Sequence, residues 1–323
     1  MNELKLNTSI EDLTVFLNSY NLLNQREKIN KISKAGQGNM NLVLRIKTNK
    51  RSFILKQSRP YAEKYPSIKA PIERINTEYS FYKTLRDNGI VKNIPKIITF
   101  QKNDFFMLIE DIGESDFSDI YSEGYVDDNI VNTLVGILKN IHSCKNIYNY
   151  PLNKELKQLN HQHIFILPFE KDNGFDLNST QQGLMDLAKE FTEDKTLKNK
   201  VLLMGKRYLN TGKTLLHGDF YPGSWMKNNK QIYIIDPEFS FVGDIEFDYA
   251  ILAAHLILIT SNIRILELLL EKHINKKIIN LKLFYNYTGV EIIRRLIGIA
   301  QLPLNSTIEQ KRKLLYFSKS LIT

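Results

Sequence analysis

Residues 215–248, LLHGDFYPGSWMKNNKQIYIIDPEFSFVGDIEFD, constrain the architecture of this chain more than any other segment. Its acidic side chains are Asp219, Asp236, Glu238, Asp244, Glu246 and Asp248, in a chain whose formal net charge is +9. Short apolar runs lead into His217-Gly218-Asp219 and into Asp236-Pro237-Glu238. Two such strands joined by a tight turn would bring both acidic ends to one edge of a hairpin. Gathered carboxylates repel one another unless a cation or a proton lies between them, so the segment predicts a metal–phosphate site.

The composition is that of a globular protein, with 43% hydrophobic and 24% charged residues among 323. This length exceeds the usual size of a single hydrophobic core, so we expect two lobes. The positive net charge favours anionic partners, among which nucleotide phosphates, nucleic acids and acidic membranes all fit. Lys and Arg are dispersed without a block of like charges, and a solvated basic surface explains the excess equally well. We therefore expect no nucleic-acid partner.

One cysteine, Cys144, excludes a disulfide within the chain and suits a reducing compartment. The first residues contain no apolar core of signal-peptide length. The longest apolar run, near residues 249–259, is too short to span a bilayer and predicts a buried helix. These features predict a soluble, cytoplasmic protein without a membrane partner.

The first part of the chain predicts a small sheet with one inserted helix. The expected elements are a helix at 9–23 capped by Ser9 or Asp12, three strands within 30–58, a helix at 71–88 and strands at 96–101 and 105–111. After a linker at 113–115, helical periodicity dominates. The expected helical segments are 128–143, 181–209 and 247 to the end, with 154–178 irregular. The prediction is an α+β fold with a β-rich N-lobe at 1–112 and a helical C-lobe at 113–323 that contains the acidic hairpin.

Lys56 ends an apolar strand, and Glu78 lies in the following predicted helix. A carboxylate in that position can hold a lysine in place to meet nucleotide phosphates, although a surface salt bridge would show the same pattern. The turn at 36–39 has two glycines, which let backbone amides approach an anion closely. A plain hairpin turn explains these glycines as well.

Asp219 follows an apolar run at a position where a carboxylate can orient a hydroxyl or accept its proton. Ser224, five positions later, is a candidate for contact with a cofactor. Asp236 and Glu238 offer the oxygen ligands that hard cations prefer. Each carboxylate taken alone could be a cap or turn residue, but their combined spacing favours a site.

Other residues of interest have two interpretations each. Asp248 could cap the next helix or brace the loop of Asp219 through backbone amides. Arg294 and Arg295 are adjacent on a helix and so diverge by about a hundred degrees. At most one of them should face the core, and a solvated face competes with anion or sugar binding. Trp225 could line a substrate pocket or anchor the hairpin.

These motifs resemble a known family. The patterns HGD-x4-S and IIDPEF are similar to the catalytic and metal motifs of the aminoglycoside phosphotransferase group, which shares the protein-kinase-like fold. Within that group the resemblance is strongest to the methylthioribose kinase branch. It extends to GQGNMNLVLRI with a Gly-Asn-x-Asn loop, to LKQSRPY with the nucleotide lysine, and to RRLIGIA with paired arginines.

The resemblance implies a role for each matching residue. Asp219 would be the catalytic carboxylate, and Asp236 and Glu238 would bind magnesium. The implied nucleotide-side residues are Gly38, Asn39, Lys56, Glu78, Ser224 and the backbone near Glu110 and Asp111. The implied substrate-side residues are Arg294, Arg295, Tyr221 and Trp225.

The leading hypothesis is thus a kinase that uses ATP and Mg²⁺ to phosphorylate a hydroxyl of a small sugar-like molecule such as 5-methylthioribose. One alternative keeps the reaction and changes the acceptor to an aminoglycoside, choline or a homoserine-type compound. Another is a nucleotide-binding pseudokinase without catalytic activity, against which the intact Lys56, Asp219 and Asp236 argue. The sequence is compatible with a homodimer.

Overall fold

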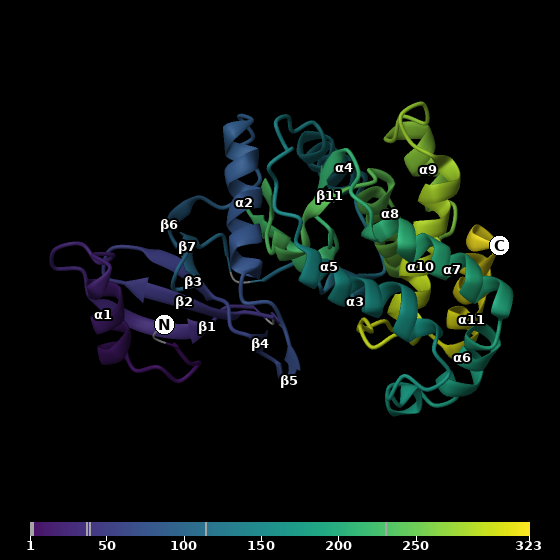
Figure 1. Cartoon of the computed structure of the whole chain (residues 1–323), viewed down its shortest axis with the longest axis horizontal. Coiled ribbons are helices and arrows are strands. Elements are labelled where there is room, and N and C mark those ends of the chain that lie inside the picture. The colour runs from purple at the N-terminus through teal and green to yellow at the C-terminus, as the bar shows by residue number, and fades with distance from the viewer. Residues whose placement is uncertain (1–2, 37, 39, 114, 230) are drawn as a thin grey trace. The chain divides into compact units, whose positions relative to one another are not determined.

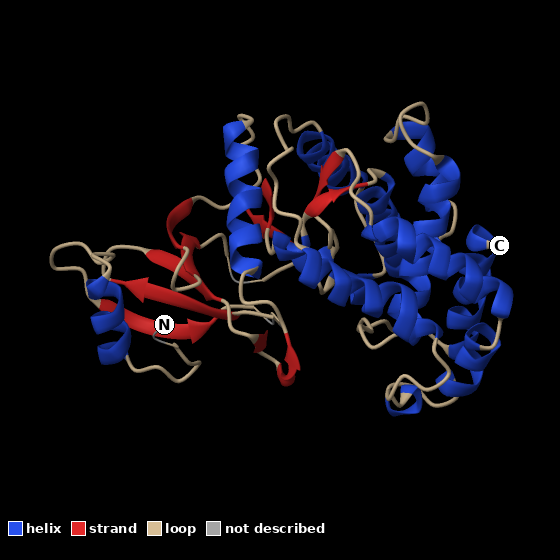
Figure 2. Cartoon of the chain, viewed as in Figure 1, coloured by secondary structure: helices blue, strands red, loops and turns tan. Residues whose placement is uncertain are grey.

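The chain forms two compact units in a computed structural model, which describes residues 3–36, 38, 40–113, 115–229 and 231–323. The first unit comprises Met1–Asp116 and Trp225–Glu238, and the second comprises Phe117–Ser224 and Phe239–Thr323. Strands prevail in the first and helices in the second (Figure 2). The α+β class expected from the sequence is therefore correct. The boundary predicted after residue 112 assigned residues 225–238 to the helical lobe, whereas they belong to the strand-rich unit.

The core of the first unit is a five-stranded sheet with the order β1-β2-β3-β7-β6 (Figure 1). Its strands are β1 (Ile29–Lys34), β2 (Leu42–Thr48), β3 (Ser52–Gln57), β6 (Ile97–Gln101) and β7 (Phe106–Glu110). All neighbouring pairs are antiparallel, and these strands lie where the sequence predicted them. A short hairpin of β4 (Tyr61–Ala62) and β5 (Tyr65–Lys69) was not predicted.

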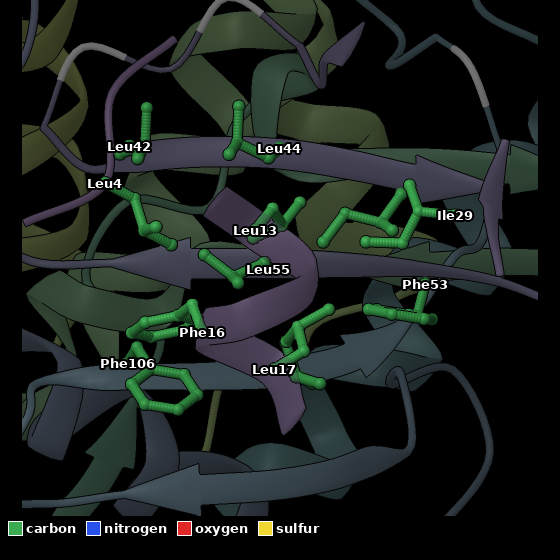
Figure 3. Close-up of a cluster of buried hydrophobic side chains, with 12 residues drawn as sticks. Leu4, Leu13, Phe16, Leu17, Ile29, Leu42, Leu44, Phe53, Leu55 and Phe106 are labelled. Carbon is green, nitrogen blue, oxygen red and sulfur yellow. The ribbon is translucent and has the colours of Figure 1, made fainter. Parts of the chain in front are cut away.

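Alternation along β3 gives the sheet two different faces, because successive side chains of a strand point to opposite sides. Leu55 joins a hydrophobic cluster with Leu13, Phe16 and Leu17 of helix α1 (Ile10–Ser19), as Figure 3 shows. The next residue of β3, Lys56, contacts helix α2 (Arg74–Asp87). The sheet thus covers an apolar core with one face and presents a charged side chain on the other.

The acidic segment forms different pairs from those expected. The apolar run β8 (Thr214–Leu216) pairs with β11 (Phe241–Gly243), whereas β10 (Gln231–Ile234) pairs with β9 (Trp225–Asn228). The predicted hairpin between the two apolar runs is therefore wrong. Residues 225–228 lie one tight turn away from β10 and form its partner locally, so β8 needs another strand.

The second unit is mainly helical. Its helices are α3 (Ile120–Glu123), α4 (Asp128–His142), α5 (Lys154–His161), α6 (Leu184–Thr192), α7 (Lys195–Leu209), α8 (Glu246–Thr260), α9 (Ile265–Lys272), α10 (Leu281–Ile297) and α11 (Ile308–Ile322). The expectation of irregular structure at 154–178 was wrong for its first part, where α5 runs into a π-turn at Gln162–Ile166. The buried residues of α5 are Leu156, Lys157, Asn160 and His161, so this segment lacks the apolar pattern from which a helix is predicted. Helix α8 is buried along nearly all its length, as predicted, and packs against α10.

Among the described residues, none of the helices combines the length and apolar character that crossing a membrane requires.

The packing of α1 on the sheet generates a stability prediction. Leu17→Ala should lower the free energy of unfolding by about 2–5 kcal/mol, because Leu17 has 0% exposure and its removal leaves a cavity. Val15 lies on the same helix with 71% exposure, so Val15→Ala should stay within about 0.5 kcal/mol of the unsubstituted protein. Urea unfolding followed by fluorescence measures both. Equal losses in the two variants would contradict the placement of α1.

Candidate active site

A buried lysine with two carboxylates lies in the first unit. The Nζ atom of Lys56 is 2.5 Å from Oε1 of Glu78 on α2, and it also forms an ion pair with Oδ1 of Asp236 after β10. The side chains of Lys56 and Glu78 are buried, so their pair is not the surface salt bridge that the sequence left open. The predicted pair is present, and the acidic segment supplies a third member.

The two carboxylates keep Lys56 charged. Burial alone would lower the pKa of Lys56, but Asp236 and Glu78 outweigh burial and raise that pKa above its ordinary value. Burial raises the pKa of Glu78 to about 7, against the opposing attraction of Lys56. The result is a fixed cation in a water-poor setting, where its field is stronger than in water.

Glu238 lies near this cation and has partners that the sequence analysis missed. Its Oε2 accepts a hydrogen bond from Nδ2 of Asn41 at 2.9 Å and lies 3.4 Å from Nε of Arg74. Burial raises the pKa of Glu238 to about 7, while Arg74 and Lys56 oppose this shift. Asn41 belongs to the GNMN motif quoted above and could have been found there. Arg74 carries no such signal, because it opens an ordinary amphipathic helix.

Arg74 also connects the glycine-rich segment to this cluster. Its guanidinium is buried and donates hydrogen bonds to the carbonyl oxygens of Met40 at 2.5 Å and Arg59 at 2.6 Å. One side chain thereby fixes the end of the turn before β2, the segment after β3, and the carboxylate of Glu238.

The backbone at Asp236 is strained. Its φ is +60°, in the left-handed region that aspartate tolerates better than most side chains, and Pro237 follows. Such conformations persist where surrounding contacts determine them, and they concentrate at functional sites. The ion pair with Lys56 is one such contact.

The donor set of Asp236 and Glu238 fits a magnesium ion. Both supply carboxylate oxygens, and Mg²⁺ is usually bound by one or two carboxylates, with waters and substrate phosphates completing its shell. No group of three or more His, Cys, Asp or Glu side chains suited to a metal occurs within the described ranges.

Asp219 lies in the second unit, on the loop that follows β8. Gly218 has a φ of +83°, and a Cβ there would collide with the carbonyl oxygen of Phe239, so the loop requires glycine. Asp248, in the first turn of α8, accepts hydrogen bonds from the backbone amides of His217 at 2.8 Å and Gly218 at 3.0 Å. Nε2 of His142 lies 3.1 Å from the same carboxylate. Of the two interpretations of Asp248, bracing of this loop is the one present.

The carboxylate of Asp219 faces a guanidinium. Nη2 of Arg295 is 3.3 Å from its Oδ1, and the Asp219 carbonyl oxygen accepts a 2.7 Å hydrogen bond from the Ser224 hydroxyl. Burial raises the pKa of Asp219, whereas Arg295 and Arg294 oppose this shift. Ser224 therefore stabilises the turn that carries Asp219.

Arg294 and Arg295 are both buried, contrary to the expectation that at most one would face the core. Nη1 of Arg294 lies 2.9 Å from Oε2 of Glu291, and Nε of Arg295 lies 2.6 Å from Oε1 of Glu291. Glu291 precedes Arg294 by three positions and Arg295 by four, and side chains at these spacings are neighbours on a helix. Both guanidinium groups can therefore reach the Glu291 carboxylate. The side chains of Arg294 and Arg295 leave the helix about a hundred degrees apart. Each is long enough to bring its guanidinium to Glu291 all the same.

The two aromatic candidates differ in their surroundings. The ring of Tyr221 lies below the guanidinium of Arg295, with 4.8 Å between Cζ and the ring centroid, in the second unit. Trp225 is fully buried in the first unit at the start of β9. Burial of Trp225 favours the hairpin anchor among its two interpretations.

The remaining predicted nucleotide-side residues lie in the first unit. Gly36 and Gly38 belong to the turn between β1 and β2, and Asn39 lies outside the described residues. Glu110 ends β7, where its Oε2 accepts a hydrogen bond from the amide of Lys96 at 3.1 Å. Asp111 follows and forms an ion pair with Arg45 of β2 at 2.9 Å.

A sheet-rich unit with a buried lysine–glutamate pair, followed by a helical unit with an HGD loop, defines the protein-kinase-like class of folds. A model of the phosphotransferase enzyme family (APH) matches residues 31–270. The chain belongs to this family.

Curated relatives include methylthioribose kinases. That of Exiguobacterium sibiricum is 28% identical over 242 residues, covering 68% of this chain and 59% of the relative. That of Bacillus mycoides is 27% identical over 240 residues, covering 69% and 59%. The chain thus spans about three fifths of the length of these relatives.

Solved structures share the fold. Spectinomycin phosphotransferase APH(9)-Ia, in complex with ADP and spectinomycin, has a TM-score of 0.56 at 16% identity, with 98% of each chain covered. LicA in complex with AMP has a TM-score of 0.55 at 16% identity, covering 96% of this chain and 98% of LicA. At such identities the likeness concerns the fold alone.

The bracing of the HGD loop generates a second prediction. The backbone amides of His217 and Gly218 bind different oxygens of the Asp248 carboxylate. In Asp248→Asn, one of these amides must therefore face an NH₂ group in place of an oxygen. The free energy of unfolding should fall by about 1–3 kcal/mol. Hydrogen exchange at these two amides should become faster than in the protein with Asp248 intact. Asp128→Asn, in the exposed first turn of α4, is the matched control. Unchanged exchange in Asp248→Asn would refute the brace.

Proposed function

We propose that this protein transfers the γ-phosphoryl group of ATP to a hydroxyl of a small sugar-like molecule, with Mg²⁺ as cofactor. The observation that carries the proposal is the buried Lys56 between Glu78 and Asp236. Burying a cation between two carboxylates costs free energy of folding. Its presence therefore favours a functional role for Lys56. Membership of the phosphotransferase family supports the same conclusion.

On the nucleotide side, Lys56 binds phosphate oxygens, and Glu78 keeps its ammonium in place. This fixed charge stabilises the negative charge of the transferring group without reorganisation during the reaction. The segment with Gly38 and Asn39 covers the phosphates with backbone amides, and the backbone at Glu110 and Asp111 binds adenine. Asn41 and Arg74 extend this set, because they hold the glycine-rich segment and Glu238 together.

Asp236 and Glu238 hold the magnesium ion in this proposal. When bound, the ion neutralises phosphate charge and helps to align the phosphates. Asp236 would supply a carboxylate oxygen to the ion, beside the ammonium of Lys56. Glu238 keeps its position through Asn41 and Arg74.

On the acceptor side, Asp219 orients the hydroxyl and takes its proton. The hydroxyl oxygen forms the new bond to the γ-phosphorus, the bond to the β,γ-bridging oxygen breaks, and ADP leaves with that electron pair. Asp248 and Ser224 keep the loop of Asp219 in place. Partial desolvation of the Asp219 carboxylate favours proton acceptance, because it raises the pKa of this group.

The proposed acceptor is a neutral sugar-like molecule. Arg295 lies beside Asp219 with Tyr221 packed on its guanidinium, and Arg294 is bound to Glu291. Hydroxyls of a sugar accept hydrogen bonds from guanidinium groups. The methylthioribose kinase relatives make 5-methylthioribose the first candidate.

The catalytic role of Asp219 is tested by Asp219→Asn. Turnover should fall by roughly 10²–10⁴-fold, because the variant cannot accept the proton of the hydroxyl. ATP should still bind with unchanged affinity, since Asp219 is not a nucleotide-side residue. A coupled assay of ADP formation over a panel of acceptors, with 5-methylthioribose, choline and an aminoglycoside, measures turnover. Normal turnover in the variant would overturn the role, and binding of ATP without any stimulating acceptor would favour the pseudokinase.

The metal role of Asp236 is tested by Asp236→Asn, which keeps the size of the side chain. Its ATP affinity should lose most of its dependence on Mg²⁺, since one of two proposed protein ligands loses its charge. Calorimetric titration of ATP with and without Mg²⁺ gives this dependence directly. Asp244→Asn, in the same acidic segment but paired with Arg207, serves as control. An unchanged Mg²⁺ effect in Asp236→Asn would count against the assignment.

A further inference from the structure

A buried chain of hydrogen bonds leads from α3 to Asp219. The Tyr121 hydroxyl lies 2.5 Å from Nδ1 of His255 on α8, and Nε2 of His255 lies 3.1 Å from Oε1 of Glu291 on α10. Glu291 binds Arg295, which reaches Asp219. Tyr121, His255, Glu291 and Arg295 are all buried, and the proposed reaction uses neither Tyr121, nor His255, nor Glu291.

The protons of this chain can be assigned. Burial would raise the pKa of Glu291, but Arg294 and Arg295 outweigh burial and hold that pKa well below its usual range, so Glu291 is ionised. Burial lowers the pKa of His255 to about 4, so its ring is neutral near pH 7. An ionised carboxylate only accepts, so Nε2 of His255 carries the proton. Nδ1 is then the acceptor, and Tyr121 donates to it.

Glu291 is the point at which three donors meet. Its Oε1 accepts from His255 and from Nε of Arg295, and its Oε2 accepts from Arg294. These donors come from α8 and from two positions of α10, so the carboxylate cannot rotate without losing one of them. Arg295 in turn divides its donors between Glu291 and Asp219.

We infer that Glu291, oriented by His255 and Tyr121, is a positioning residue that keeps Arg295 from closing fully on Asp219. The inference rests on the proposed role of Asp219. With Glu291 ionised, the charge of Arg295 is shared between two carboxylates. Without the charge of Glu291, Arg295 would pair with Asp219 alone. This pairing would turn the Asp219 carboxylate away from the acceptor hydroxyl and reduce the affinity of Asp219 for a proton.

The other charged and titratable groups around Asp219 do not replace Glu291. His217 lies on the same loop as Asp219, and Arg294 is bound to Glu291. Tyr221 packs against both Arg295 and His255, with ring centroids of Tyr221 and His255 5.4 Å apart. Glu291 is therefore the anion on α10 that competes with Asp219 for Arg295.

Glu291→Gln in the full chain tests the inference. The value of kcat should fall by about a hundredfold, as expected when a catalytic group is misplaced by about 1 Å. The acidic limb of the pH–kcat profile should move to lower pH, and KM for ATP should stay unchanged. Retained kcat with an unmoved limb would overturn the inference.

Two more variants separate positioning from folding. Tyr121→Phe removes only the hydroxyl that orients His255, so it should give a smaller change of kcat in the same direction. Glu246→Gln removes the charge of another buried carboxylate, which binds the amide of Asn280, and should leave kcat and the pH limb unchanged. Equal losses in Glu246→Gln and Glu291→Gln would show a merely structural role and overturn the inference.

A readout that needs no turnover keeps this test distinct from that of the proposed function. The ¹³C chemical shift of the Asp219 carboxyl, followed against pH, gives its titration midpoint in any folded variant. The midpoint should be lower in Glu291→Gln than in the protein with Glu291 intact. An unchanged midpoint would overturn the inference even if no acceptor is phosphorylated. A lowered midpoint without turnover would support the positioning of Asp219 and reject only the proposed reaction.

Discussion

The desolvated ammonium of Lys56 is the constraint on which the first unit depends. A buried cation is tolerated only with opposite charges beside it, and removal of one partner of a buried pair is far more costly than loss of a surface bridge. Glu78 comes from α2 and Asp236 from the segment after β10, so one cation fixes three pieces of chain. This explains why residues 225–238 pack with the sheet although helical sequence surrounds them.

In the second unit the charges are reversed, because carboxylates there require nearby cations. Glu291 and Asp219 are carboxylates in buried surroundings, and Arg294 and Arg295 compensate their charge. Burial raises the proton affinity of one carboxylate while the arginines hold the other ionised. Two groups of the same chemical type thereby acquire different properties, which is how neighbouring acids take separate roles in enzymes.

Much of the fold could be predicted because it depends on local patterns. The apolar run that ends at Lys56 predicted β3, and the helical spacing of apolar residues predicted α1 and α4. The pairing of β8 with β11 could not be predicted, since strand choice depends on contacts between distant segments. Arg74 and Glu291 were missed for the same reason. Each looks like an ordinary helical charge until the fold brings its partners near.

The central claim is the proposed transfer of the γ-phosphoryl group from ATP to a hydroxyl of a small molecule. The most direct measurement follows the label of [γ-³²P]ATP into 5-methylthioribose, with Mg²⁺ present or removed by a chelator. We expect Mg²⁺-dependent label on a sugar hydroxyl in equal amount to the ADP formed. Bound ATP whose label stays on the nucleotide with 5-methylthioribose and every other acceptor tried would contradict the account.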